Sequence, residues 1–306
     1  MGNAFSLSEL KEAYEKNENI MKLLREDAGN SPLAIQVSYE LQSGSYTKIA
    51  ESLNTEEKKL KTERFRNIAK TITPFIADCN SILEAGIGEA TSFTYLIDNL
   101  SKNFHEKDYR LSGFDISWSR LYYAKRNIKK HLNTQAELFT ADLQNIPLCD
   151  NSVDMVFTNA AIEPNLGREK LILSELYRIC AKTLIIIEPD YERADGGQKK
   201  RMEEHGYCRN LGEIIKNNGW TVKIGATYQT LSYPLTLRLI RKEETNAAAG
   251  NFFSYICPAC KTPLIYSEDN LFCPTDGVIY PIIKDIFCLL KSNAILAVKY
   301  MDGEFF

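Results

Sequence analysis

The stretch Ser81-Ile82-Leu83-Glu84-Ala85-Gly86-Ile87-Gly88-Glu89-Ala90 decides the fold of this chain. Residues 81–85 are mostly apolar, as in a buried strand, and two glycines follow them before a helix-like run at Thr91–Lys102. Glycines in a turn between a strand and a helix let the backbone approach a ligand closely. The stretch therefore predicts the first strand of an open sheet, with a ligand site at the carboxyl end of that strand.

Short apolar runs alternate with longer amphipathic runs from this strand onward. The predicted strands are Ser81–Ala85, Arg110–Asp115, Ala136–Ala141, Val153–Thr158 and Thr183–Glu188. The predicted helices between them are Thr91–Lys102, Ser119–Leu132, Lys170–Cys180 and Lys199–Asn217. Such alternation implies crossover connections and a parallel sheet. Thr221–Ile224 and Leu235–Ile240 have no helix between them and predict an antiparallel hairpin at the sheet edge. We predict the α/β class, with a doubly wound, mostly parallel sheet.

The flanking segments predict two further units. Apolar residues recur at helical spacing within residues 7–27 and Glu56–Ile72, whereas Tyr39–Tyr46 is too polar and rich in glycine and serine for a core element. The run at 243–251 has the composition of a linker, and residues 252–292 are rich in cysteine, proline and aromatic residues. The predicted domains are a helical cap at 1–72, a sheet domain at 73–245 and a compact β-rich unit at 252–292.

Composition narrows the class of partner. The 306 residues carry 37 Lys and Arg against 40 Asp and Glu, a net charge of -3, so no global positive field favours nucleic acid. The basic run Lys199-Lys200-Arg201 is interrupted downstream by acids and predicts a solvated helix face. No apolar window is long enough for a membrane span, and the first residues lack a signal-peptide pattern. We expect a cytoplasmic protein whose cysteines stay reduced, and the oligomeric state is left open.

Three acidic residues follow three successive predicted strands. Glu84 precedes the glycine turn, Asp115 ends the second strand and Asp142 follows the third. Because the carboxyl ends of parallel strands meet at one edge, these acids face one crevice. Their carboxylates suit a cationic amino-acid head group, ribose hydroxyls and an adenine edge, in that order. A dinucleotide loop favours glycine or alanine at position 91, where Thr91 stands, so the pattern indicates a different ligand.

Residues 80–190 resemble the class I S-adenosylmethionine-dependent methyltransferases. The matching segments are Glu84–Gly88, Asp115, Ala141–Leu143 and Pro147–Asp154. The last of these is similar to a segment of the ubiquinone-type branch, which acts on small molecules. The resemblance implies a Rossmann-like methyltransferase fold and S-adenosylmethionine as cofactor. Tyr39–Tyr46 resembles an N-terminal motif whose aromatic residue closes over the cofactor in some relatives, and a surface tyrosine is the alternative for Tyr46. The cofactor-binding residues so implied are Tyr46, Glu84, Ala85, Gly86, Gly88, Asp115, Ile116, Asp142, Leu143 and Asn159.

Candidates for the reacting residues lie in loops beyond the predicted strands. Methyl transfer from a sulfonium requires in-line alignment, and a general base is needed only for a hydroxyl or a protonated amine. Glu163 follows the fourth strand and is suited to orient or deprotonate an acceptor, although an acid that stabilises a helix N-terminus is the alternative. His205 has an ordinary pKa suited to a base, and a solvated histidine on a charged helix is the alternative. We predict Glu163 and His205 as catalytic residues.

The cysteines of the last unit have the spacing of a zinc ribbon. Cys257 and Cys260 form a Cys-x-x-Cys turn, and Cys273 follows after twelve intervening residues. Asp276 stands where a fourth thiol is usual, and its oxygen is also a zinc ligand. Val278–Leu290 resembles the end of the small zinc-ribbon activator subunit of nucleic-acid and protein methyltransferases. We predict zinc on these four residues, with a metal-free unit held by packing as the alternative.

Together these patterns predict an enzyme that methylates a hydroxyl or amine of a small molecule, such as a sugar or secondary metabolite. An RNA base methyltransferase is one alternative, because one family of ribosomal guanine methyltransferases also carries a zinc ribbon. The negative charge and the sequence Asn159-Ala160-Ala161-Ile162, which lacks the Pro-Pro-aromatic motif of amino-methylating enzymes, disfavour it. A non-catalytic partner of another methyltransferase is the second alternative.

Overall fold

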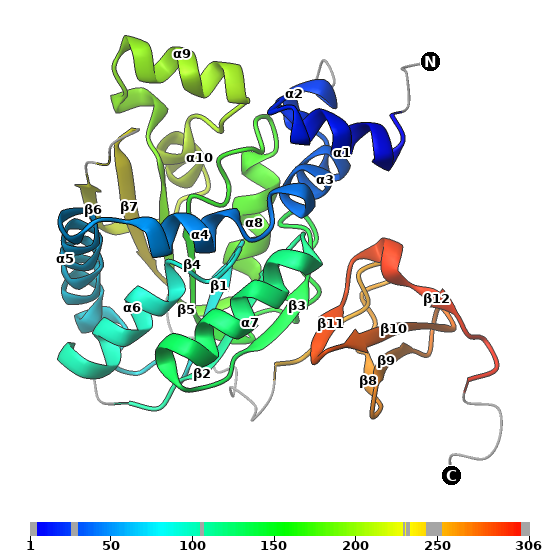
Figure 1. The fold of residues 1–306 in the computed structure, drawn as a ribbon. Coiled ribbons are helices and arrows are strands. Elements are labelled where there is room, and N and C mark those ends of the chain that lie inside the picture. The colour runs from blue at the N-terminus through cyan, green and yellow to red at the C-terminus, as the bar shows by residue number, and fades with distance from the viewer. Residues whose placement is uncertain are drawn as a thin grey trace.

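A computed structural model describes residues 5–25, 30–104, 107–228, 230, 233–242 and 253–300. Its centre is the predicted parallel sheet, in the order β3-β2-β1-β4-β5-β7-β6 (Figure 1). The strands are β1 (Ser81–Ala85), β2 (Arg110–Asp115), β3 (Glu137–Thr140), β4 (Val153–Asn159), β5 (Cys180–Pro189), β6 (Val222–Tyr228) and β7 (Leu235–Arg241). Strands β1 to β5 run parallel, and the β6–β7 hairpin is antiparallel at one edge. The α/β class and the doubly wound, mostly parallel sheet are confirmed.

Helices cover both faces of this sheet. They are α5 (Thr55–Ile72), α6 (Phe93–Asn99) continued by η2 (Leu100–Phe104), α7 (Trp118–Leu132), α8 (Glu169–Ile179) and α10 (Leu211–Asn217). Helix α9 (Gly196–His205) lies beyond the strands at the top of Figure 1, and η1 (Thr73–Phe75) and η3 (Tyr191–Arg193) are short turns. Asn54 caps α5 through a reciprocal capping box with Glu57. The prediction of one helix over Lys199–Asn217 is wrong, because Gly206 takes a φ of 66° and ends α9 before α10 begins.

The N-terminal cap contains more helix than the sequence predicted. It consists of α1 (Leu7–Glu15), α2 (Ile20–Leu23), α3 (Pro32–Gln42) and α4 (Ser45–Ser52). Tyr39–Tyr46 contains the end of α3 and the start of α4, and only Ser43 and Gly44 separate the two helices. Gly44, at a φ of 87°, allows the sharp break between the two helices. Helices α3 and α4 lie across the carboxyl ends of the strands (Figure 1).

The tail forms strands β8 (Ile265–Tyr266), β9 (Asn270–Cys273), β10 (Val278–Ile283), β11 (Ile286–Cys288) and β12 (Ile295–Leu296), with the turn η4 (Lys291–Asn293). Strand β11 pairs in parallel with β3, so the tail lengthens the central sheet at that edge (Figure 1). The amide of Ile256 also donates to the Pro147 carbonyl at 3.1 Å. The predicted linker at 243–251 lies outside the described residues. In the part of the chain that the structure describes, every helix falls short of what a membrane span needs.

Candidate active site

A cavity lies at the carboxyl ends of β1, β2, β3 and β4, beneath α3 and α4. Successive strands are added to one side of β1 and then to the other, and a doubly wound sheet opens a crevice where this order reverses. Most of the predicted site residues line it together: Tyr46, Glu84, Gly86, Gly88, Asp115, Ile116, Asp142, Leu143, Asn159 and Glu163. Ala85 and His205 are not among its lining residues.

The glycine turn packs too closely for side chains. Gly86 and Gly88 take φ values of 70° and 54°, in the left-handed region. A Cβ atom on Gly86 would lie 2.4 Å from the Cβ of Ala161, and one on Gly88 would lie 2.6 Å from a guanidinium nitrogen of Arg120. The turn therefore presents bare backbone to the cavity, as a closely held ligand requires.

Among the residues that the structure describes, two oxygen atoms in the cavity wall have no hydrogen-bond donor. They are Oε2 of Glu84 and Oδ1 of Asn159. Glu84 is 1% exposed, and burial, followed by the charge of Asp115, raises the pKa of its carboxyl well above its usual range. Buried acceptors without donors are costly, so a ligand that donates hydrogen bonds would stabilise this part of the cavity. An ammonium group fits this requirement.

Asp115 is already oriented by the backbone. Its carboxylate accepts the amides of Gly88 at 2.9 Å and Ser117 at 3.0 Å, and a guanidinium nitrogen of Arg120 lies 4.0 Å away. Burial raises its pKa, while Arg120 and the two amides act in the opposite direction. A carboxylate has about four acceptor positions, so positions remain for ligand hydroxyls.

Sequence reasoning missed Arg120 and Glu89. The buried guanidinium of Arg120 lies between the rings of Tyr39 and Tyr46, 4.5 and 4.7 Å from their centroids. Glu89 accepts the amides of Gly44 and Thr47 at 2.8 and 2.7 Å, which joins the glycine turn to the start of α4. Both contacts connect the cap to the sheet, and no local pattern in the sequence indicates them.

Glu163 lines the same cavity from the loop after β4 and is 8% exposed. The hydroxyl of Tyr233 donates to its Oε2 at 3.0 Å, and the hydroxyl of Tyr207 also donates to the carboxyl group. Burial and the nearby charge of Glu188 raise the pKa of Glu163 to about 8. A carboxyl group with this pKa exchanges protons near neutral pH, which suits a general base or acid.

The loop that carries Glu163 is held by Glu188 at the end of β5. The carboxylate of Glu188 accepts the amides of Ala161 and Ile162 at 3.0 and 3.1 Å, and burial raises its pKa to about 7. His205 does not reach the cavity lining; its ring contacts that of Tyr207 at a centroid distance of 5.8 Å. Burial lowers the pKa of His205. The segment His205–Tyr207 was expected to supply polar groups near the crevice, whereas Tyr233 carried no sequence signal, because it lies far from Glu163 along the chain.

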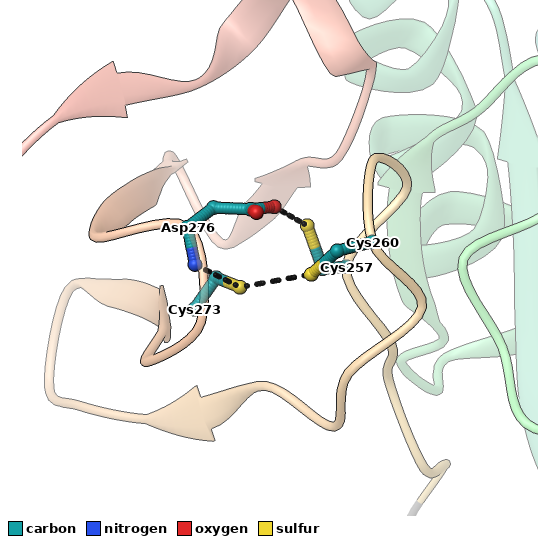
Figure 2. Close-up of side chains that lie close together, drawn as sticks. All are labelled: Cys257, Cys260, Cys273 and Asp276. Carbon is teal, nitrogen blue, oxygen red and sulfur yellow. Dashed lines mark hydrogen bonds between the residues drawn. The ribbon is translucent and has the colours of Figure 1, made fainter.

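The four predicted metal ligands converge in the tail (Figure 2). Ligand atoms of Cys257, Cys260, Cys273 and Asp276 all lie within 4.8 Å of one another. The sulfurs of Cys260 and Cys273 are 3.4 Å apart, and Sγ of Cys257 is 3.2 Å from Oδ2 of Asp276. Three sulfurs and one oxygen at this spacing fit a tetrahedral zinc ion.

Groups around the cluster also suit thiolate ligands. The amides of Ala259 and Asp276 point to the sulfurs of Cys257 and Cys273, each at 3.4 Å. The hydroxyl of Tyr280 lies 3.4 Å from Sγ of Cys257. Such outer donors orient metal ligands and stabilise their charge.

Residues 82–183, a third of the chain, match the family model described as a methyltransferase domain. The magnesium protoporphyrin IX methyltransferase of Synechocystis PCC 6803 is similar in structure. Its complex with SAH is 15% identical with a TM-score of 0.51, covering 69% of this chain and 99% of that one. Its complex with SAM has the same identity and score and covers 71% and 100%.

A SAM dependent methyltransferase from Aquifex aeolicus is 19% identical with a TM-score of 0.41, covering 57% of this chain and 88% of that one. No curated protein matches the sequence. Residues 82–183 thus match a methyltransferase domain, and the chain shares the fold of such enzymes, which supports an enzyme here.

Proposed function

We propose that the enzyme transfers a methyl group from S-adenosylmethionine to a hydroxyl or amine of a small molecule. One observation carries the choice of donor: the unpartnered Oε2 of Glu84 lies beside a bare glycine turn and next to the oriented carboxylate of Asp115. The structurally similar Synechocystis enzyme has SAM or SAH bound in its two complexes, which supports the same ligand here. The ubiquinone-type branch rests on the resemblance at Pro147–Asp154 and belongs to the proposal.

Each part of the donor would have a partner in the cavity. Glu84 would accept the ammonium group of its methionine part, and Asp115 would accept the ribose hydroxyls. Asp142, with Ile116 and Leu143 nearby, would hold the adenine. Tyr46, whose ring already packs on Arg120, would cover the cofactor from α4. Bound in this way, the donor supplies a methyl group on a sulfonium, and alignment of the acceptor with it provides much of the rate enhancement.

Glu163 is the preferred catalytic residue because it lines the cavity from the loop after β4 and its carboxyl group is suited to exchange a proton. We assign it to orient the acceptor and to take its proton. His205 is the second candidate from the sequence, and its contact with Tyr207 supports an indirect effect on Glu163. A cytoplasmic location, in which all eight free cysteines stay reduced, belongs to the same proposal.

Zinc on Cys257, Cys260, Cys273 and Asp276 is part of this proposal. The ion would join the Cys-x-x-Cys turn to the end of β9 and thereby hold the tail against the sheet edge at β3. The resemblance of the tail to the zinc-ribbon activator subunit is a further support. Its role here would be structural, because the cluster contributes no residue to the cavity lining.

Methyl transfer to mixed acceptors tests the proposed function. The purified protein is incubated with labelled S-adenosylmethionine and either pooled metabolite extract or total RNA, and products are identified by mass spectrometry. We expect label in small molecules. Label only in RNA would favour the RNA methyltransferase, and cofactor binding without any transfer would favour the non-catalytic partner.

A further inference from the structure

The acids that line the cavity differ in what balances their charge. Glu89 accepts two amides at the start of α4, and Asp115 accepts two amides and lies 4.0 Å from Arg120. Asp142 is partly exposed to solvent and accepts the amide of Gln144 at 2.9 Å. Under the proposed function, Glu84 receives the ammonium group of the donor. Each of these four acids therefore has a partner that accounts for its charge.

Glu163 differs because, among the described residues, the groups that hydrogen-bond to its carboxyl group are neutral hydroxyls. Its carboxyl group accepts hydrogen bonds from the hydroxyls of Tyr233 and Tyr207. Within the described ranges of the chain, no lysine or arginine nitrogen lies within 4.0 Å of its oxygens. A buried carboxylate of this kind is stable only if it takes a proton or if a cation arrives beside it.

The charged and titratable groups that face Glu163 come from every element around it. They are Tyr39 of α3, Tyr46 of α4, Arg120 of α7, Glu188 of β5, Tyr207 and Cys208 between α9 and α10, and Tyr233 before β7. Arg120 is the cation among them, and its guanidinium is held between two tyrosine rings. The rings of Tyr207 and Tyr233 pack edge to face at 5.8 Å beside Glu163. A carboxylate flanked by aromatic rings is the environment that a ligand cation favours.

We propose that the part of the cavity lined by Glu163 and Tyr233 receives the methyl acceptor as an ammonium ion, so that the enzyme methylates the nitrogen of an amine. This inference rests on the proposed function and narrows its acceptor class. Glu163 is the catalytic base, because its oxygen takes the proton from the ammonium nitrogen. Tyr207 and Tyr233 are positioning residues, because they hold the carboxylate through their hydroxyls.

The reaction balances without a further reagent. The ammonium N–H bond breaks, its proton moves to a Glu163 oxygen, and the electron pair stays on nitrogen. That pair forms the bond to the methyl carbon, and the carbon–sulfur bond breaks with its electrons left on sulfur. The products are a methylated ammonium ion, neutral S-adenosylhomocysteine and one proton on Glu163, which is released to solvent.

Proton affinity favours an amine over an alcohol. The pKa of Glu163 is raised to about 8, first by burial and then by Glu188. An alkylammonium ion has a pKa of about 10.4, so it is two to three powers of ten less acidic than the Glu163 carboxyl group. Proton transfer across a difference of this size occurs readily between bound partners. An alcohol hydroxyl, with a pKa near the value of about 15.7 for water, lies more than seven powers of ten above it.

Selective blocking of amines tests this inference. Pooled metabolite extract is treated with acetic anhydride and then with mild base, which leaves amines as amides and frees the hydroxyls again. We expect methyl transfer into this extract to fall at least about tenfold relative to mock-treated extract. Undiminished transfer would overturn the amine assignment while leaving the proposed function intact. Absence of both S-adenosylhomocysteine binding and transfer into untreated extract would instead overturn the proposed function.

A binding measurement gives a readout that does not depend on turnover. Benzylammonium and benzyl alcohol are titrated by calorimetry into the protein saturated with S-adenosylhomocysteine. We expect the ammonium ion to bind at least about tenfold more tightly than the alcohol, and Glu163→Gln to remove that preference. Glu213→Gln, an exposed change on α10, is the matched control and should keep it. Equal affinities, no binding of the ammonium ion, or a preference that persists in Glu163→Gln would each overturn the inference.

Tyr233→Phe provides a second variant if Glu163→Gln does not fold. The Tyr233 hydroxyl lowers the pKa of Glu163, so its loss should raise that pKa. The acidic limb of the pH profile of kcat/KM should then move to higher pH, with unchanged affinity for S-adenosylhomocysteine. A purely structural role of Tyr233 would leave the limb in place, and that result would contradict its role as a positioning residue.

Discussion

The carboxylates around the glycine turn and the carboxyl group of Glu163 are held in different ways. At the glycine turn, backbone amides orient Glu89 and Asp115, and the guanidinium of Arg120 lies near Asp115. In the loop after β4, Glu163 is held by two tyrosine hydroxyls and is exposed to the repulsion of Glu188. Asp115 therefore suits the role of a fixed acceptor, whereas Glu163 suits proton exchange. Under the proposed function, the electrostatic surroundings of the binding group and of the base differ within one cavity.

Glu163→Gln should have the largest effect, and this effect should fall on kcat rather than on cofactor affinity. If Glu163 is the base, this change lowers kcat by about 10²- to 10⁴-fold, because the amide cannot take a proton. Affinity for S-adenosylhomocysteine should change little, since the proposed function assigns Glu163 to the acceptor and not to the cofactor. Steady-state kinetics with calorimetry checks both values, and Glu213→Gln is the control. Full activity in Glu163→Gln would show that Glu163 is not the base.

The tail cluster is a second candidate site, where three thiols and one carboxyl group lie close together. Cys260→Ser should weaken zinc binding by about 100-fold or more, since one of four ligands is changed. The tail should become sensitive to protease while cofactor binding persists. Elemental analysis and limited proteolysis measure these effects, and Cys288→Ser, which lies outside the cluster, is the control. Purified protein with well under one zinc per chain, and with no stability lost on chelation, would support a metal-free tail.

Asp115→Ala tests the proposed ribose acceptor beside the glycine turn. The change would remove hydrogen bonds to the ribose that contribute about 1.5–3 kcal/mol each, so affinity for the cofactor should fall about tenfold or more. The amides of Gly88 and Ser117 also lose their acceptor, which adds to the loss. Asp108→Ala, at an exposed acid, should bind normally. An unchanged dissociation constant in a folded Asp115→Ala protein would reject the ribose assignment.

The smallest effect concerns stability as a function of pH. Folding raises the pKa of Glu163 from 4.5 to about 8, so between these values the folded chain binds more protons than the unfolded chain. Stability should therefore fall as pH rises through this window, and Glu163→Gln should escape that fall. At pH 9, we expect the Tm of Glu163→Gln to exceed that of wild type by roughly 2–4 °C for each kcal/mol of unfolding free energy that the variant regains. The difference in Tm should be smaller at pH 5. An equal difference at both pH values would contradict the raised pKa.

The sequence predicted the sheet, and it predicted that the glycine turn and the strand-end acids lie together, because both features depend on neighbouring residues. The turn at Glu84–Gly88 and the acids at strand ends lie within single strand-to-helix connections, so their spacing alone indicates their place. The tail cluster was predictable for the same reason, since one Cys-x-x-Cys turn and one later turn define it. All of these groups converge in the structure as the patterns indicated.

The surroundings of Glu163 were only partly predictable, because segments distant in the sequence contribute the residues that contact it. Glu163 was named from its loop, but Tyr207 and Tyr233 reach it from the segments after α9 and before β7. The cap was underestimated because Tyr39–Tyr46 forms helices through contacts such as Glu89 to Gly44, which local composition does not reveal. Long-range contacts of this kind override local propensity.

Calorimetric titration of S-adenosylhomocysteine into wild-type protein and Glu84→Gln tests whether the cavity binds S-adenosylmethionine through Glu84. We expect saturable binding of one ligand per chain in wild type. We also expect at least about tenfold weaker binding in Glu84→Gln, because the buried oxygen that lacks a donor would no longer meet the ammonium group as a carboxylate. No binding to wild type, or equal affinity in the folded variant, would contradict this assignment of the cofactor site.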